Sequence, residues 1–422
     1  VGGSSDGRHK GLTAPHPEGQ ARALNRAYAK SGLSPASVGL IEAHGTGTVA
    51  GDRSEIETLK QVFESAHARH RGCALGSVKS TTGHTKSAAG VAGLIKVALA
   101  LHHKCLPPTI GVESPNPSLV DSPFYVNTEL RPWIHGVKSH PRRAGVSSFG
   151  FGGTNFHAVV EEYTGDFLDT CHEPVSVNRP EELFLFSADS HESLLALMGR
   201  ISDGLQQGAK PEMVDLAYAL WKERAEQPEF RVAIVAQSLA DLAQKIQVAE
   251  EVVKAGREIG EDVQGVYYSK SPVGKTGKTA FLFPGQGSQH PGMLRELAVH
   301  FCEVRDSFCR ADRVLAERFD KSLSDYIFPP PCFRKEDNDR CQKELTQTHV
   351  AQPALSAAGM GVFRLLQSFQ VYPDFVAGHS SGEYAALCAA EVFDEKDLYR
   401  LTEARGRFIT EMTGDDTGTM AA

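Results

Sequence analysis

Residues 42–48 read EAHGTGT, and residues 83–85 read GHT after the segment SVKS at residues 77–80. Each stretch places one histidine, His44 or His84, among small residues that favour tight turns. A histidine in such a turn is, by itself, more often structural than catalytic. Two uncharged imidazoles held together can donate hydrogen bonds to one thioester carbonyl oxygen, which stabilises an enolate. The pair therefore indicates a site for enolate chemistry.

A third motif, GVSSFGFGGTN, follows at residues 145–155. In this order, the three motifs resemble the C-terminal half of a β-ketoacyl synthase of the polyketide and fatty-acid synthase type, over residues 1–163. The resemblance implies a thiolase-like α/β fold for this region. The part of the family that carries the nucleophilic cysteine has no counterpart in the sequence, and the chain begins without Met, so we expect a fragment.

The resemblance also implies roles for individual residues of this first region. His44 and His84 would bond the enolate oxygen, and Lys79 would neutralise and orient the site. Glu55 is expected to be the partner of Lys79. The sequence has Arg53 where the family usually has proline, and this guanidinium could redirect the Glu55 carboxylate.

The same resemblance assigns the substrate contacts. Thr46 and Thr48 would line the pantetheine tunnel, and the backbone N–H of Phe151 would form one arm of an oxyanion hole. No cofactor would be bound, because phosphopantetheine arrives on an acyl carrier protein. The family also implies a homodimer formed through the ketosynthase.

A second chemistry is predicted near the C-terminal end, where residues 375–383 read FVAGHSSGE. A strand that runs into Gly-x-Ser-x-Gly and then directly into a helix is a nucleophile elbow. Ser380 would be exposed on the turn, with a helix N-terminus behind it that favours developing negative charge. Gly378 and Gly382 would permit the sharp turn and the close packing of helix on strand.

Further motifs are FPGQGSQ at residues 283–289, THVAQP at 348–353 and EARG at 403–406. With the elbow, they resemble malonyl-type acyltransferases over residues 279–422, which implies part of an α/β-hydrolase-like core. The family takes its acyl group from a coenzyme A thioester such as malonyl-CoA.

Within this family, the backbone N–H groups of Gln286 and Ser381 would form the oxyanion hole. Arg405 would bind the carboxylate of the extender unit, because a guanidinium can pair with it through two hydrogen bonds. No histidine follows Ser381, although a serine nucleophile needs a base, so this domain is also expected to be incomplete. The isolated chain is accordingly expected to be inactive.

Two alternatives remain open at this stage. A serine esterase with an N-terminal extension would explain the Gly-x-Ser-x-Gly motif but requires a downstream histidine. A non-catalytic scaffold remnant would explain the missing partners, but it gives no reason to keep His44, Lys79, His84 and Ser380 together.

Residues 164–278 resemble the linker domain between ketosynthase and acyltransferase, a small α/β unit without concentrated catalytic side chains. A strand at 183–186, a helix begun by Asp189 and Glu192, a helix at 213–224, a strand at 231–236 and a helix begun by Ser238 are predicted. The domain boundaries are thus 1–163, 164–278 and 279–422.

Composition limits the remaining possibilities. The 422 residues are 41% hydrophobic and carry a net charge of −8, which argues against a nucleic-acid binder. The eight cysteines include no CxxC pair, so we expect neither a metal site nor a disulfide framework. We therefore expect a cytoplasmic location. The longest apolar run, residues 88–101, is too short to span a membrane and is predicted to be a buried helix.

Charge is unevenly distributed along the chain. Residues 1–163 hold 17 Lys and Arg against 12 Asp and Glu, a balance of +5, so the remainder carries −13. A basic first region is compatible with an acidic partner, such as the acyl carrier protein that the resemblance implies.

Overall fold

The computed structural model describes residues 1–6, 15–165, 180–224, 228–256, 265–270 and 277–413. The chain divides into two compact units, one of residues 1–173, 281–372 and 376–422 and one of residues 174–280 and 373–375. Helices and strands alternate in both units, so the predicted mixed α/β class is confirmed.

Among described residues 1–165, six strands form one mixed sheet in the order β1-β8-β7-β2-β3-β5. Strand β2 lies parallel to β3 and β7, whereas β8 is antiparallel to β7 and β1. The strands are β1 (Gly2–Ser5), β2 (Leu40–Glu42), β3 (Cys73–Gly76), β5 (Phe124–Val126), β7 (Arg143–Gly150) and β8 (Thr154–Glu161), with β4 (Cys105–Leu106) and β6 (Arg131–Pro132) paired separately.

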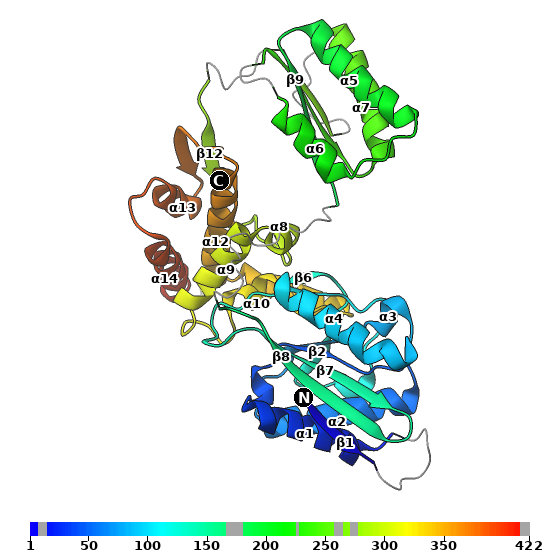
Figure 1. Ribbon diagram of the computed structural model, residues 1–422. Helices are drawn as coiled ribbons and strands as arrows, with labels where there is room; N and C mark the ends of the chain where they lie inside the picture. The colour runs from blue at the N-terminus through cyan, green and yellow to red at the C-terminus, as the bar shows by residue number, and fades with distance from the viewer. Residues whose placement is uncertain (7–14, 166–179, 225–227, 257–264, 271–276, 414–422) are drawn as a thin grey trace. The chain divides into compact units, whose positions relative to one another are not determined.

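Helices cover both faces of this sheet (Figure 1). Because successive side chains of a strand point to opposite faces, Ile41 packs in one core with Leu59, and Leu40 packs in the other with Val97. Helices α1 and α2 therefore share one face, and α4 occupies the other. The helices are α1 (Pro17–Ser31), α2 (Val49–Ser65), α3 (Lys79–Thr82) and α4 (Ala89–His102).

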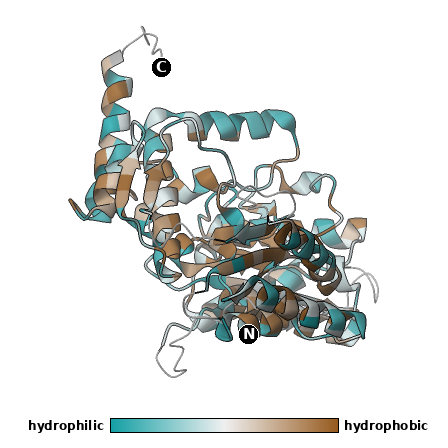
Figure 2. Ribbon diagram, turned by 90° about the horizontal axis from the view of Figure 1, so that it is seen from above, coloured by the Kyte–Doolittle hydropathy of each residue, from teal (hydrophilic) through white to brown (hydrophobic). Residues whose placement is uncertain are grey.

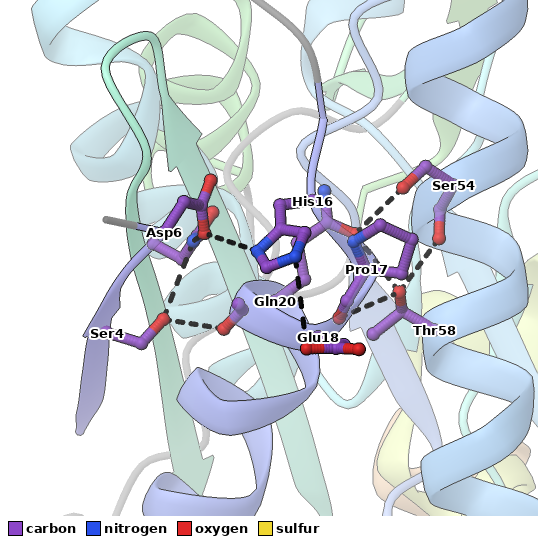
Figure 3. A network of polar contacts seen from close by, with 10 residues as sticks. Ser4, Asp6, His16, Pro17, Glu18, Gln20, Ser54 and Thr58 are labelled. Atoms are coloured by element: carbon purple, nitrogen blue, oxygen red, sulfur yellow. Dashed lines mark hydrogen bonds and ion pairs between the residues drawn. The ribbon is translucent and has the colours of Figure 1, made fainter. Parts of the chain in front are cut away.

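A polar network holds the beginning of α1 against β1 and α2 (Figure 3). The Thr58 hydroxyl on α2 donates to Gln20 Oε1 at 3.1 Å, and the Ser4 hydroxyl on β1 donates to the Gly19 carbonyl at 2.5 Å. These bonds fix the position of α2, which carries the predicted site residue Glu55.

The apolar run at residues 88–101 does form a helix, α4, but its predicted burial is wrong for one face. Val97, Ala100 and Leu101 are buried against the sheet. On the other side, the exposed fractions are 60% for Val91, 41% for Leu94, 56% for Ile95 and 51% for Leu99. A helix that is apolar on all sides needs cover on all sides, and the described residues cover only the face towards β2 and β7.

The two faces of α4 should respond differently to substitution. Ile95→Gln is expected to change the free energy of unfolding of this chain by less than about 0.5 kcal/mol, because Ile95 is already exposed. Val97→Ala should cost about 1–3 kcal/mol, because it opens a cavity at a position with 0% exposure. Urea unfolding of both variants measures the contrast, and equal losses would show that Ile95 is covered in solution.

The second unit contains, in its described part, a three-stranded antiparallel sheet in the order β11-β10-β9. The predicted strands and helices are confirmed, except that Ser190 rather than Asp189 caps the first helix, and β11 was not predicted. The elements are β9 (Glu182–Ala188), α5 (His191–Gln206), α6 (Met213–Lys222), β10 (Phe230–Ala236), α7 (Leu239–Ala255) and β11 (Val266–Ser269).

The C-terminal part of the first unit is built around α12, which packs against α9, α13 and α14. Figure 2 shows helices that carry both hydrophilic and hydrophobic residues. The elements are β12 (Ala280–Phe283), α8 (Arg295–His300), α9 (Cys302–Val314), α10 (Leu323–Ile327), α11 (Lys335–Thr346), α12 (Thr348–Ser368), β13 (Phe375–Gly378), α13 (Gly382–Ala389) and α14 (Glu395–Thr413). None of the described helices is both long and apolar enough to cross a membrane.

Candidate functional site

The two predicted histidines lie together at one edge of the six-stranded sheet. His44 follows the end of β2, and His84 follows α3, which begins three residues after the parallel neighbour β3 ends. The centroids of the two imidazole rings are 5.7 Å apart, and the ring planes are nearly perpendicular at 88°. Both rings are thus close enough to form hydrogen bonds with a single substrate atom.

The backbone around His44 is held by a buried carboxylate. Glu55 on α2 accepts the N–H groups of His44 at 2.7 Å and Gly45 at 2.9 Å. Gly45 has φ +48°, and a β-carbon there would stand 2.9 Å from Ser77 Cβ, so only glycine fits this turn. Burial raises the pKa of Glu55 to about 7.

The electrostatics of the site keep His44 uncharged. Burial, followed by the charge of Lys79 and then by His84, lowers the pKa of His44 to about 4. Partial desolvation and the charges of Lys79 and Lys86 also lower the pKa of His84. Near neutral pH both rings are therefore neutral. A neutral imidazole can donate a hydrogen bond to an enolate oxygen, whereas a charged one would transfer its proton to the enolate.

The tautomer of His84 follows from one hydrogen bond. The backbone N–H of Lys86 donates to His84 Nδ1 at 3.0 Å, which makes Nδ1 an acceptor. In the neutral ring, the proton is then on Nε2, and Nε2–H is free to donate. The sequence did not predict this contact, and Lys86 has a positive φ of 54°.

The remaining residues predicted for this region have mixed surroundings. The Arg53 guanidinium pairs with Glu57 at 2.8 Å, so it does not redirect the Glu55 carboxylate. The hydroxyls of Thr46 and Thr48 lie 3.0 Å apart, and Thr48 caps α2 by accepting the Gly51 N–H at 3.2 Å. Both threonines thus have a local structural role, and their contact with pantetheine stays a prediction.

Two further predictions for this region concern Lys79 and Phe151. Within the described residues, no ion pair joins Lys79 to Glu55, which accepts the backbone N–H of His44 instead. The Glu55 charge still acts on Lys79, because burial lowers the pKa of the Lys79 ammonium and the Glu55 charge raises it. Phe151 lies just beyond β7 with a side chain that is 78% exposed. Its backbone N–H has no acceptor among the residues that the structure describes.

The second predicted site has the geometry of a nucleophile elbow. Ser380 lies between β13 and α13 with φ +54°, a conformation that is strained for a residue with a side chain. A β-carbon at Gly378 would stand 2.1 Å from the carbonyl carbon of Gly382, so the strand and the helix approach too closely for any other residue. The elbow predicted from the sequence is therefore confirmed as a backbone structure.

Two backbone donors lie beside this elbow. A β-carbon at Gly285 would stand 3.2 Å from Ser380 Cβ, which places the loop after β12 next to the serine. In the described part of the chain, the N–H groups of Gln286 and Ser381 have no acceptor. Unpaired N–H groups on both sides of a serine can receive the oxygen of a tetrahedral intermediate.

Arg405 lies on α14, next to the helix that follows the elbow. Its guanidinium carbon is 5.9 Å from the ring centroid of Tyr384 on α13. No acidic side chain of the described residues lies within 4 Å of it, and the nearby Glu403 pairs with Arg407 instead. A half-buried guanidinium without a carboxylate partner can bind a substrate carboxylate.

A general base for Ser380 is not found among the described residues, since no side chain there forms a hydrogen bond with its hydroxyl. Thr348, at the start of α12, contacts both the loop after β12 and helix α14. Gln286 Nε2 donates to Thr348 Oγ1 at 3.3 Å, and a β-carbon at Gly406 would stand 2.6 Å from the Thr348 carbonyl oxygen.

The sequence reasoning missed one buried pair beside the histidines. Glu42 is 2% exposed, and its Oε2 lies 2.9 Å from Lys96 Nζ. The available signal was a charged residue at each of two positions that are otherwise apolar: the end of a buried strand and the middle of the run at residues 88–101.

Comparison with protein-family models assigns three consecutive regions. Residues 1–113 match the C-terminal domain of β-ketoacyl synthases, residues 115–235 match the ketoacyl-synthetase C-terminal extension, and residues 280–422 match the acyl transferase domain. The chain therefore contains regions of two classes of transferase.

Curated relatives match almost the whole chain. The chain is 36% identical to a polyunsaturated fatty acid synthase protein of Thraustochytrium sp. over 96% of its length, and 36% identical to the polyketide synthase GfsA of Streptomyces halstedii over 97%. The chain spans only 15% and 5% of these two proteins. A solved ketosynthase from module 6 of the bacillaene synthase of Bacillus subtilis is 37% identical, with 64% of this chain and 46% of that chain covered and a TM-score of 0.37. The chain belongs to the type I polyketide synthase family, as the sequence motifs predicted.

Proposed function

We propose that residues 1–163 take part in the decarboxylative condensation of acyl thioesters. The observation that carries this proposal is the pair of neutral, perpendicular imidazoles of His44 and His84. Loss of carbon dioxide from a malonyl thioester leaves an electron pair that spreads onto the thioester oxygen. The Nε2–H of His84 donates to that oxygen, and the His44 ring lies beside it. Release of carbon dioxide from a malonyl thioester, measured in a synthase that contains this sequence, tests the proposal.

The charge of Lys79 serves this reaction in two ways. It opposes protonation of both histidines, which keeps them neutral, and it attracts the negative charge that develops on the extender unit. The acyl chain to be extended would be held on a cysteine, and its tetrahedral oxygen would meet the backbone N–H of Phe151. Thr46 and Thr48 would contact the pantetheine arm that delivers the substrates.

We further propose that residues 279–422 load a carboxylated extender unit onto an acyl carrier protein through an acyl-Ser380 intermediate. The Ser380 hydroxyl oxygen attacks the thioester carbonyl carbon, the carbon–sulfur bond breaks, and coenzyme A leaves as the free thiol after its sulfur takes the serine proton. The pantetheine thiol of the carrier protein then attacks the acyl ester, and its proton restores the Ser380 hydroxyl. The N–H groups of Gln286 and Ser381 stabilise the oxyanion that forms in each attack. A serine hydrolase has less support, because the acyl transferase model matches residues 280–422.

Selection of the extender unit should depend on Arg405. Arg405→Ala is expected to reduce loading of a malonyl thioester by about 2–4 kcal/mol in transition-state stabilisation, because its carboxylate loses a charge-assisted partner. Loading of an acetyl thioester, which has no carboxylate, should change far less. Acyl-enzyme formation from labelled malonyl-CoA and acetyl-CoA, each as kcat/KM, measures the difference.

Arg400→Ala provides the matched control, because Arg400 is an exposed arginine on the same helix. It should leave loading of both thioesters unchanged. If Arg405→Ala impaired malonyl and acetyl loading equally, Arg405 would serve the fold and not the selection of substrate.

The organisation that accompanies this function is also a proposal. Its parts are a ketosynthase region at residues 1–163, a linker domain at 164–278 and an acyltransferase region at 279–422. The partners are a phosphopantetheine-bearing acyl carrier protein, malonyl-CoA or a related acyl-CoA, and a second ketosynthase in a homodimer. The reaction would take place in the cytoplasm.

A further inference from the structure

The buried carboxylate of Glu42 connects the three elements that build the condensing site. Glu42 is the last residue of β2 and stands two positions before His44. Its Oε1 accepts the backbone N–H of Val78 at 2.5 Å, at the turn from which α3 begins. Its Oε2 lies 2.9 Å from the ammonium of Lys96 on α4. One side chain therefore joins the strand before one histidine to the turn before the other.

Helix α4 packs directly on this carboxylate. A β-carbon at Gly93 would stand 2.9 Å from Glu42 Cγ, and the Lys96 side chain is only 14% exposed. A charge in such surroundings needs a partner, because its desolvation costs several kcal/mol. Since α4 begins shortly after His84, the pair also limits where the segment that carries His84 can lie.

We propose that Glu42 is a positioning residue of the condensing site: its side chain holds the Val78 turn so that Lys79 and His84 face His44, and Lys96 balances the charge of the buried carboxylate. The inference rests on the condensation function proposed above. Neither residue touches the reacting atoms, so Glu42 acts through the turn. The carboxylate at position 42 has two separate tasks, an ion pair with Lys96 and a hydrogen bond from the Val78 backbone.

Electrostatics agree with this arrangement. Burial lowers the pKa of Lys79, whereas the carboxylates of Glu55, Glu42 and Asp52 raise it and thereby support the charged form. The charge of Lys79 in turn helps to lower the pKa of His44. If the turn moved Lys79 away, the His44 pKa would rise towards its ordinary value.

Two double variants separate the two tasks of Glu42. Glu42→Gln with Lys96→Met removes both charges but keeps an amide oxygen that can accept the Val78 N–H. Glu42→Lys with Lys96→Glu keeps an ion pair but leaves the Val78 N–H without an acceptor on residue 42. If only the ion pair matters, the reversed pair should restore the wild-type properties. If the hydrogen bond to the Val78 N–H matters, the neutral pair should restore them and the reversed pair should not.

The experiment measures the His44 pKa by NMR titration of this chain, together with kcat and KM for condensation in a synthase that contains it. Glu42→Ala should raise the His44 pKa above about 4 and lower kcat by roughly 10- to 100-fold, with little change in KM. The neutral pair should restore both values. The reversed pair should restore stability in urea but neither the His44 pKa nor kcat.

Removal of an exposed ion pair on α2, by Arg53→Gln with Glu57→Gln, is the matched control and should change none of these values. Restoration of kcat and of the His44 pKa by the reversed pair would overturn the proposal. If Glu42→Ala fails to fold, the two double variants still decide the question. If the parent synthase does not condense, yet the His44 pKa responds as expected, the positioning is correct and the proposed function is wrong.

Discussion

Replacement of His44 or His84 by alanine is expected to lower the rate of condensation about a hundredfold or more while acyl loading of the synthase continues. The reason is where negative charge develops. Loading places it on a tetrahedral oxygen near the Phe151 N–H, whereas decarboxylation places it on the carbonyl oxygen of the extender unit. Each lost donor removes roughly 3 kcal/mol of stabilisation from the second oxygen alone.

Radiolabelled acyl loading and product formation should be measured on the same variant, in a synthase that contains this sequence. His102→Ala is the control, because His102 is an exposed histidine at the end of α4. Loading that falls as much as condensation in both variants would contradict the assignment of the two histidines to the enolate oxygen.

Ser380→Ala should abolish covalent acyl transfer, with a loss on the order of 10⁴-fold or more in the rate of acyl transfer. Alanine cannot form the acyl ester, so any remaining turnover must come from direct attack by another nucleophile that is bound near the two N–H donors. The variant should fold, because it removes one hydroxyl that makes no hydrogen bond among the described residues.

Retention of label from malonyl-CoA on the denatured protein measures the acyl-serine directly. Ser368→Ala, at the end of α12, should retain the label as the parent does. A Ser380→Ala protein that still became labelled on the acyltransferase region would place the nucleophile elsewhere.

Local features were predictable because they depend on neighbours in the sequence. The elbow at Ser380 follows from two glycines at fixed spacing, and the helix begun by Ser238 follows from a side chain that accepts the Asp241 N–H at 3.1 Å. The same reasoning placed the earlier cap at Asp189, one residue before the observed cap Ser190, because both side chains are capable of capping.

Burial was less predictable, as α4 shows. Its apolar run gives the helix but does not say which face the sheet covers, and Ile95 and Leu99 are exposed where burial was expected. The partner of Arg53 was also hard to predict, because two carboxylates, Glu55 and Glu57, lie near it in the sequence. The guanidinium pairs with Glu57, which lies one turn along the helix.

The sequence by itself determined the family and predicted the two chemistries, because the motifs around His44, His84 and Ser380 can each be recognised within a few residues of chain. Only the tertiary structure decided how they are supported. The bond from the Val78 N–H to Glu42 and the ion pair of Glu42 with Lys96 join residues that are 36 and 54 positions apart. Such contacts form only when parallel strands and a crossing helix bring distant segments together, and no local pattern records them.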